Sequence, residues 1–205
     1  MHSQGEEIRR RYDRIAPWFD SLEGFLEGLI FRRLRKMLWA QASGKHILEV
    51  GVGTGKNFGF YPRSAQITAI DFSPKMLAQA QRKKDRKQVD VELALMDVQT
   101  ICYADNSFDT VVASFVFCSV PLPRKGLKEL HRVLKPGGQL LLLEHVLSSN
   151  KVMAGLMNAA NPVVVRLFGA NINRQTLKNV QACPFQQIFV DPASSDMIKL
   201  IRAVK

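Results

Sequence analysis

The chain has 205 residues, and its 29 lysines and arginines outnumber 18 aspartates and glutamates to give a formal net charge of +11 at pH 7. A chain of this length buries a substantial core without disulfides or metal ions, so we expect a single domain spanning residues 1–205. Its 46% hydrophobic and 23% charged residues exclude a disordered or collagen-like protein.

The cysteines and the first residues indicate the compartment. Cys102, Cys118 and Cys183 lack the close spacing of redox or metal motifs and cannot all pair, which favours a reducing, cytoplasmic location. The first residues contain no apolar segment, so no signal peptide is expected. No apolar run reaches the roughly 18 residues of a membrane span.

The excess positive charge is concentrated in residues 75–88 and 124–135, which we interpret as outer helices. Solvated helix faces are one explanation of this charge, and peripheral contact with an anionic partner, such as the cytoplasmic face of a membrane, is another. Nucleic acid is not expected as a partner, because the sequence has no RNA-binding signature and no aromatic residues interleaved with the basic ones.

Residues 1–40 are predicted to form a lid followed by an amphipathic helix. Pro17 should end any helix before it, and the nearby aromatic residues Tyr12, Trp18 and Phe19 indicate a lid folded over a ligand. From residue 22 to residue 38, apolar side chains recur every three or four positions, which predicts a helix packed on a sheet or touching lipid. We expect its polar face to carry Glu23, Glu27, Arg32, Arg33, Arg35 and Lys36.

The centre of the sequence is a predicted strand that runs into a glycine loop. Residues 46–50 are mostly apolar, and glycines follow at positions 51, 53 and 55. A second apolar run, residues 67–70, ends in Asp71. A glycine loop after one strand and a carboxylate at the end of the next is how open α/β sheets hold a nucleoside.

The remaining elements alternate along the chain. We expect a short helix at 56–61, a helix capped by Ser73, strands at 89–95 and 108–114, a helix at 124–134, a tight turn at Lys135-Pro-Gly-Gly138 and a strand at 139–146. Residues 152–170 are expected to form two short helical pieces, because Asn158, Asn161 and Pro162 interrupt them. Residues 185–191 and 197–205 are predicted to close the sheet as an antiparallel pair. The sequence therefore predicts an α/β, doubly wound, mostly parallel sheet with helices on both faces.

Five motifs follow one another in the order seen in class I S-adenosylmethionine-dependent methyltransferases, which the chain resembles over residues 46–146. The motifs lie at residues 49–55, 70–76, 96–97, 108–112 and 133–138. The resemblance implies a seven-stranded Rossmann-like methyltransferase fold, with S-adenosyl-L-methionine as cofactor and S-adenosyl-L-homocysteine as product. The glycine spacing also favours this cofactor over a dinucleotide, because the third glycine of G-x-G-x-x-G would fall at Lys56.

The resemblance implies roles for individual residues. The glycine backbone is expected along the methionine part of the cofactor, Asp71 at the ribose hydroxyls and Asp97 at the adenine amino group. Tyr12 belongs to a Tyr-Asp-x-x-Ala motif similar to the lid of several members, where the tyrosine reaches the cofactor carboxylate. The full expected cofactor-binding set is Tyr12, Glu49, Gly51, Gly53, Gly55, Asp71, Phe72, Met76, Asp97, Val98 and Ser114.

Groups that act on the acceptor should lie at the carboxyl ends of the fourth and fifth strands, which selects Cys118, Glu144 and His145. His145 is the candidate general base, because an unperturbed imidazole titrates near neutrality; a histidine bonded to a nearby loop is the alternative. Glu144 and Tyr12 complete the expected catalytic set, and Cys118 is expected to be a small buried wall residue. The histidines lack metal-ligand spacing, so no metal is predicted.

Three branches of the family suggest three acceptors. The lid resembles that of quinone C-methyltransferases and bacterial phosphatidylethanolamine N-methyltransferases. Membrane thiol methyltransferases are similar at residues 57–62, 117–120, 144–146, 169–174 and 203–205, although the N-terminal anchor of that branch is not seen here. All three imply a small lipophilic or membrane-associated acceptor, and residues 151–182 are expected to form a substrate-side insertion. The alternative function is a non-catalytic S-adenosylmethionine-binding regulatory or interaction module.

Overall fold

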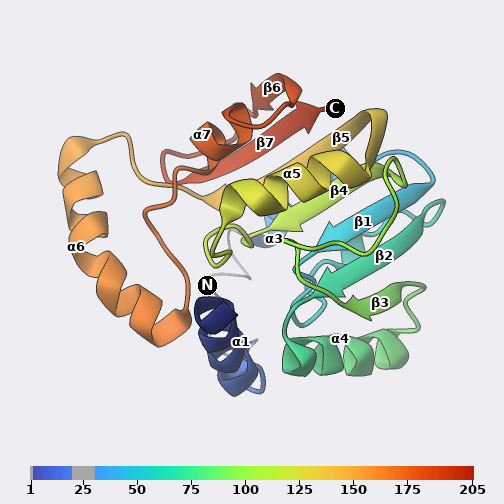
Figure 1. Ribbon diagram of the computed structural model, residues 1–205. Helices are drawn as coiled ribbons and strands as arrows, with labels where there is room; N and C mark the ends of the chain where they lie inside the picture. Colours follow the sequence, from blue (N-terminus) through green and yellow to red (C-terminus); the bar gives the residue numbers. More distant parts are fainter. Residues whose placement is uncertain (1, 20–30) are drawn as a thin grey trace.

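The computed structural model describes residues 2–19 and 31–205, and its centre is a seven-stranded sheet with the order β3-β2-β1-β4-β5-β7-β6 (Figure 1). The strands β1 to β5 pair in parallel, and β7 is antiparallel to both β5 and β6, which confirms the predicted sheet and its closing pair. The strand bounds are β1 His46–Val50, β2 Gln66–Asp71, β3 Glu92–Leu95, β4 Phe108–Ser114, β5 Leu134–His145, β6 Gln186–Val190 and β7 Ile198–Val204.

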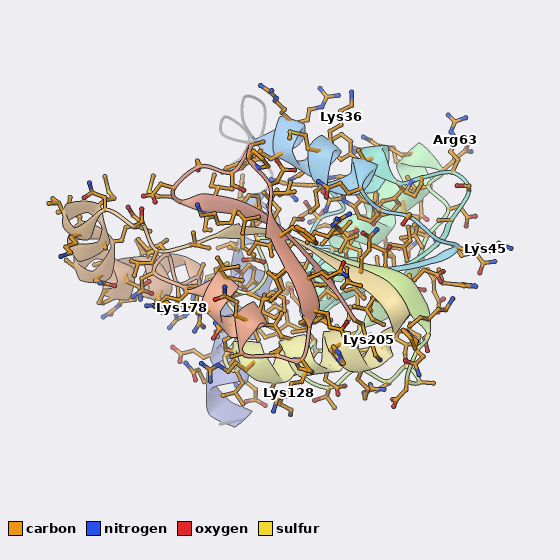
Figure 2. All side chains as sticks on the ribbon, turned by 90° about the horizontal axis from the view of Figure 1, so that it is seen from above. Lys36, Lys45, Arg63, Lys128, Lys178 and Lys205 are labelled. Atoms are coloured by element: carbon orange, nitrogen blue, oxygen red, sulfur yellow. The ribbon has the colours of Figure 1, made fainter. Side chains whose placement is uncertain are left out.

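Helices cover both faces of the sheet, as predicted. α3 (Arg32–Ala40) and α4 (Pro74–Lys87) contribute to one buried cluster, and α5 (Pro123–Val133) and α7 (Thr176–Gln181) contribute to the other. Figure 2 shows Lys36 of α3 and Lys128 of α5 on opposite sides of the sheet. The strands supply both clusters because successive side chains point to opposite faces: Ile47 packs with α3 and Leu48 with α5.

Local chemistry explains two predicted helix boundaries. α4 begins after Ser73, whose hydroxyl accepts a hydrogen bond from the Met76 amide at 3.1 Å, and Pro74 occupies the first turn. α1 (His2–Ile15) ends just before Pro17, whose ring cannot continue a helix. Both boundaries are therefore set by residues that the sequence identifies directly.

The predicted amphipathic helix is described only in part, and one of its assignments is wrong. The apolar positions 22–30, together with Glu23 and Glu27, lie outside the described residues. Arg35 was expected on the polar face but is buried, with 6% of its surface exposed. Phe31, Arg35 and Leu38 are spaced by four and three residues, so they share the inward side of the helix.

Two shorter predictions are corrected as well. Residues 56–61 were expected to be a helix but form turns and a single 3-10 turn, η2 (Phe58–Phe60). The expected tight turn at residues 135–138 is instead an irregularity within β5. There, Phe108 pairs with Leu134 and Thr110 with Gln139, so the intervening residues bulge out of the ladder.

The expected pair of helical pieces is one helix, α6 (Lys151–Phe168), with Pro162 inside it. Asn158 and Asn161 do not break this helix, because both bind the segment that follows it. Asn161 Oδ1 accepts from the Ile172 amide, and Asn158 Oδ1 accepts from Asn173 Nδ2, each at 2.9 Å. Figure 1 shows α6 bending as it projects from the body, as a helix with an internal proline does.

Candidate functional site

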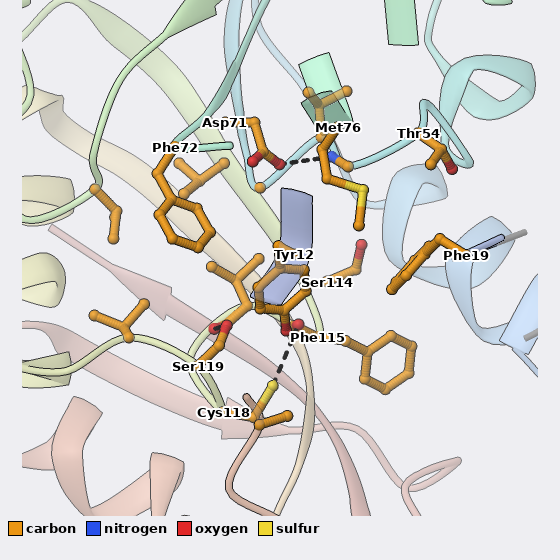
Figure 3. A pocket seen from close by; sticks show the side chains of 18 of the residues that line it. Tyr12, Phe19, Thr54, Asp71, Phe72, Met76, Ser114, Phe115, Cys118 and Ser119 are labelled. Carbon is orange, nitrogen blue, oxygen red and sulfur yellow. Dashed lines mark hydrogen bonds between the residues drawn. The ribbon is translucent and has the colours of Figure 1, made fainter. Parts of the chain in front are cut away.

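A cavity of about 500 Å³ lies at the carboxyl ends of β1, β2 and β4, where the strand order reverses between β1 and β4. In open α/β sheets, this reversal leaves a crevice that binds ligands. In the view of Figure 3, Asp71, Phe72 and Met76 lie at one end, and Phe115 and Cys118 lie at the other. Helices α1 and α6 complete the wall through Tyr12 and Val164, respectively.

The glycine loop brings bare backbone to the cavity. Gly51 has φ +69°, and a Cβ there would lie 2.4 Å from a Val116 methyl, so a larger residue would have to displace the loop after β4. Gly53 has φ +55° and lines the cavity, and a Cβ there would meet nothing within 4 Å. The loop therefore offers an open, uncharged surface along which a ligand chain can lie.

Asp71 ties the glycine loop to the start of α4. Its Oδ2 accepts a hydrogen bond from the Gly53 amide at 2.8 Å (Figure 3), and its Oδ1 accepts from the Ser73 amide at 2.9 Å. The carboxyl is 5% exposed, and burial raises its pKa to about 6. Each oxygen keeps further acceptor capacity toward the cavity that it lines, which suits a ligand with neighbouring hydroxyl groups.

α1 contacts the loop after β2 on one side and α6 on the other. The Tyr12 ring packs edge-on against Phe72, with 5.7 Å between the ring centroids. Asp13 Oδ1 accepts from the Ser73 hydroxyl at 2.6 Å, and Arg11 donates to the Val165 carbonyl of α6. These contacts place the predicted lid motif against the loop after β2 and against α6.

A buried polar cluster, which sequence reasoning missed in part, lies beneath the glycine loop. Arg35 Nη1 donates to the Ser114 hydroxyl at 2.8 Å and to Asn57 Oδ1 at 3.2 Å. The Asn57 amide and the Tyr61 hydroxyl both donate to Glu49, and burial raises the pKa of Glu49 to about 7. Arg35 and Asn57 line the cavity. The sequence feature that indicates burial of Arg35 is its helical spacing from the apolar residues Phe31 and Leu38.

The other end of the cavity is aromatic. His145 lies beside Phe31 and Phe115, with ring centroids 5.8 Å and 4.8 Å away, and these two phenylalanines are 4.9 Å apart. Burial lowers the pKa of His145, so the imidazole is neutral at pH 7. The Met197 backbone opposes this lowering of the His145 pKa, and the His145 side chain lines the cavity.

Glu144 supports this end from behind. It is fully buried, and its Oε1 accepts from the Val116 and Phe117 amides at 2.9 and 3.0 Å. Its Oε2 has no hydrogen-bond partner in the described part of the chain, and burial raises its pKa to about 7. Cys118 lines the cavity as a small buried wall residue, and burial raises the pKa of its thiol to about 12, so it is not a thiolate at neutral pH.

The cavity gathers most of the residues that the sequence predicted. Gly55, Glu49 and Glu144 are not part of its described lining, but each is hydrogen-bonded to a residue that is: Val52, Asn57 and Val116, respectively. Asp97 is exposed at the rim, where its carboxylate accepts from the Gln99 amide at 2.8 Å. The predicted residues that line the cavity are Tyr12, Gly51, Gly53, Asp71, Phe72, Met76, Asp97, Val98, Ser114 and His145.

Comparisons with known proteins agree with this geometry. A family model described as a methyltransferase domain matches residues 48–142. The chain is 36% identical to a phosphatidylethanolamine N-methyltransferase of Cereibacter sphaeroides, over 75% of both chains. It is 35% identical to a thiol S-methyltransferase of Rattus norvegicus, over 69% of this chain and 60% of the relative.

Two further similarities extend this picture. The chain is 34% identical to a ubiquinone/menaquinone biosynthesis C-methyltransferase of Geotalea daltonii, over 70% of this chain and 65% of the relative. Among solved structures, an S-adenosylmethionine-dependent methyltransferase from Thermotoga maritima superposes with a TM-score of 0.73 at 16% identity, covering 96% of this chain and 99% of that one. This last likeness concerns the fold alone.

Proposed function

The chain belongs to the class I S-adenosylmethionine-dependent methyltransferases, and we propose that its acceptor is a small lipophilic molecule such as a phospholipid head-group amine, a quinone or a thiol. The relatives are named for these three acceptors. The observation that carries the proposal is the aromatic end of the cavity, formed by Phe31, Phe115 and His145, which offers an apolar acceptor a surface to pack on.

The residues at the opposite end fit S-adenosylmethionine. Asp71 would accept hydrogen bonds from the ribose hydroxyls, and the open backbone at Gly53 would lie along the methionine part. Phe72 and Met76 would pack on the adenine, with Asp97 and the Val98 amide near its amino group. When bound, the cofactor supplies an electrophilic methyl group on a sulfonium.

The protein contributes alignment, exclusion of water and removal of a proton. We assign His145 as the base, since it is neutral at pH 7 and lines the acceptor end, where its ring packs against Phe31 and Phe115. We assign Glu144 a positioning role, because it holds the Val116 and Phe117 amides and with them the wall beside Phe115. Tyr12 would orient the cofactor from the lid.

Peripheral contact with the cytoplasmic, anionic face of a membrane completes the proposal. The net charge of +11 and a lipophilic acceptor that resides in membranes support contact with an anionic membrane. The three unpaired cysteines support its cytoplasmic side, where thiols stay reduced. Within residues 2–19 and 31–205, no helix combines the length and the apolar character needed to cross a bilayer.

The acceptor class is tested with radiolabelled methyl donor and a panel containing phosphatidylethanolamine, a demethylated quinone and an alkyl thiol. We expect label in one of these acceptors. Calorimetric binding of S-adenosylmethionine without label in any of them would favour the alternative, a cofactor-binding module without catalysis.

A further inference from the structure

Helix α6 exposes an apolar surface to solvent. Its sequence contains no acidic residue, and none of its side chains placed by the structure is buried. Val152, Leu156, Val163 and Leu167 are 75%, 61%, 60% and 60% exposed, respectively. Single exposed apolar residues are ordinary on a protein surface, but a group of large ones on one helix marks a binding surface.

These four residues form one stripe, which we call the α6 stripe. They are separated by four, seven and four positions, so a helical repeat of 3.6 residues places them on the same side of α6. Asn158 and Asn161, which bind residues 173 and 172, occupy the opposite side. The helix is therefore anchored along one side and presents the stripe on the other.

The α6 stripe is continuous with the candidate site. Val164, next to Val163, lines the cavity, as does Ala170 just beyond the helix. α1 packs on the same stretch, since Arg11 donates to the Val165 carbonyl. Figures 1 and 2 both show α6 projecting from the body of the protein, and the exposure of the four stripe residues leaves them open to contact from outside.

Exposed cations are carried by α6 itself and by α1, the helix that packs against it. α6 carries exposed Lys151 and Arg166, and α1, which packs against it, carries exposed Arg9, Arg10 and Arg14 beside the acidic pair Glu6 and Glu7. Trp18, 69% exposed, follows α1. A helix that combines exposed apolar side chains with lysine and arginine and carries no acidic residue is typical of a lipid interface.

The positive charge favours a membrane over a second copy of the chain as the partner of the α6 stripe. A second copy of the chain would bring another +11 against these cations, whereas an anionic bilayer accepts both the apolar stripe and the positive charge. We propose that the α6 stripe inserts into the interface of an anionic membrane, and that the acceptor enters the cavity from the membrane past Val164. The insertion deepens the membrane contact that forms part of the proposed function, and the entry route also rests on the proposed lipophilic acceptor.

The test is flotation of the full chain with vesicles of phosphatidylcholine alone or of phosphatidylcholine mixed with phosphatidylserine. The wild type is expected to float with the mixed vesicles, and the double variant Val152→Ser/Leu156→Ser should bind them at least about tenfold more weakly. The matched control is Phe189→Ser, which removes a 48% exposed aromatic side chain from β6 at the far edge of the sheet, and it should bind like the wild type.

Three results would overturn the inference: equal flotation of the double variant and the wild type, equal loss of binding in Phe189→Ser, or a vesicle-independent dimer that the double variant abolishes. Methyl transfer to a water-dispersed thiol or quinone, or to detergent-dispersed phosphatidylethanolamine, measured without vesicles, separates this inference from the proposed function. The double variant should keep that activity. Activity of the wild type without vesicle binding contradicts only the proposed insertion of the α6 stripe. Vesicle binding without activity on any of these acceptors contradicts only the proposed acceptor class.

Discussion

The guanidinium of Arg35 donates to the hydroxyl of Ser114 at 2.8 Å, so a cation from α3 is buried at the carboxyl end of β4, midway along the cavity wall. The same nitrogen reaches Asn57, which in turn binds Glu49. One side chain therefore organises the polar floor between the proposed donor end and the proposed acceptor end.

Replacing Arg35 should cost stability. Arg35→Met leaves Ser114 and Asn57 buried with fewer hydrogen-bond partners and removes the cation whose charge acts on Glu49, so we expect the free energy of unfolding to fall by about 3–5 kcal/mol. The control is Arg32→Met, an exposed position on the same helix, where a change within about 0.5 kcal/mol is expected. Urea unfolding measures both, and equal effects would contradict the role of the cluster.

Asp71 should carry much of the cofactor affinity. Asp71→Ala removes a buried acceptor at the proposed ribose site, and we expect S-adenosylmethionine to bind about 1–3 kcal/mol more weakly by calorimetry. Asp85→Ala on the exposed side of α4 serves as the control and should leave the affinity unchanged. An Asp71 variant with wild-type affinity would rule out this role.

The raised pKa of Asp71 predicts a pH dependence of binding. Burial raises the pKa to about 6, so the carboxylate that we propose accepts the ribose hydroxyls is depleted as the pH falls through 6. The affinity for S-adenosylmethionine should therefore decline between pH 7 and pH 5. In Asp71→Asn, which has no carboxyl to titrate, the decline should be absent, and a profile identical to that of the wild type would place the titration elsewhere.

His145 should affect turnover more than binding. With an acceptor that must lose a proton, His145→Gln is expected to lower kcat by about 10²–10⁴ and to leave the cofactor affinity unchanged. His131→Gln provides the comparison, because His131 packs on Phe185 away from the cavity. Unaltered kcat in the His145 variant would show that the acceptor needs no base at this position.

Glu144 should make stability depend on pH. Its pKa in the folded chain is about 7, above the ordinary 4.5, so the cost of ionising it is absent below pH 4.5 and grows as the pH rises to 7. The stability of Glu144→Gln relative to the wild type should thus improve between pH 5 and pH 8, by at most about 3 kcal/mol.

The comparison for that experiment is Glu129→Gln, because the Arg132 guanidinium lowers the pKa of Glu129. That carboxylate stabilises the fold above its ordinary pKa, so its removal should be unfavourable throughout pH 5 to 8. Unfolding curves at several pH values give both differences, and a Glu144 variant whose relative stability ignores pH would contradict the assigned burial cost.

The local structure of the proposed donor half could be predicted from the sequence because its determinants are local. The local backbone conformation is determined by nearby residues: the spaced glycines of the loop, Asp71 at the strand end, and Ser73 before Pro74 at the helix start. Their meeting at one cavity follows from the strand reversal between β1 and β4.

The acceptor half depends on packing between distant segments. Glu144 and His145 are adjacent and point to opposite sides of β5, and only the finished sheet shows that His145 faces the cavity. The sequence pattern predicted Arg35 on the polar face of its helix, but α3 packs against β4 and β5 in a way that buries this side chain. α6 stays one helix because its asparagines bind residues 172 and 173, a contact that helical periodicity does not report.

The proposed lipophilic acceptor is tested most directly by initial rates of methyl transfer to pairs of acceptors that differ in polarity. The pairs are phosphatidylethanolamine and phosphoethanolamine, a quinone and a hydroxylated quinone, and an alkyl thiol and cysteine. The aromatic end formed by Phe31, Phe115 and His145 predicts that one lipophilic member is methylated much faster than its polar counterpart, and that Asp71→Ala reduces this activity. Equal rates within every pair, or transfer to the polar members alone, would contradict the claim.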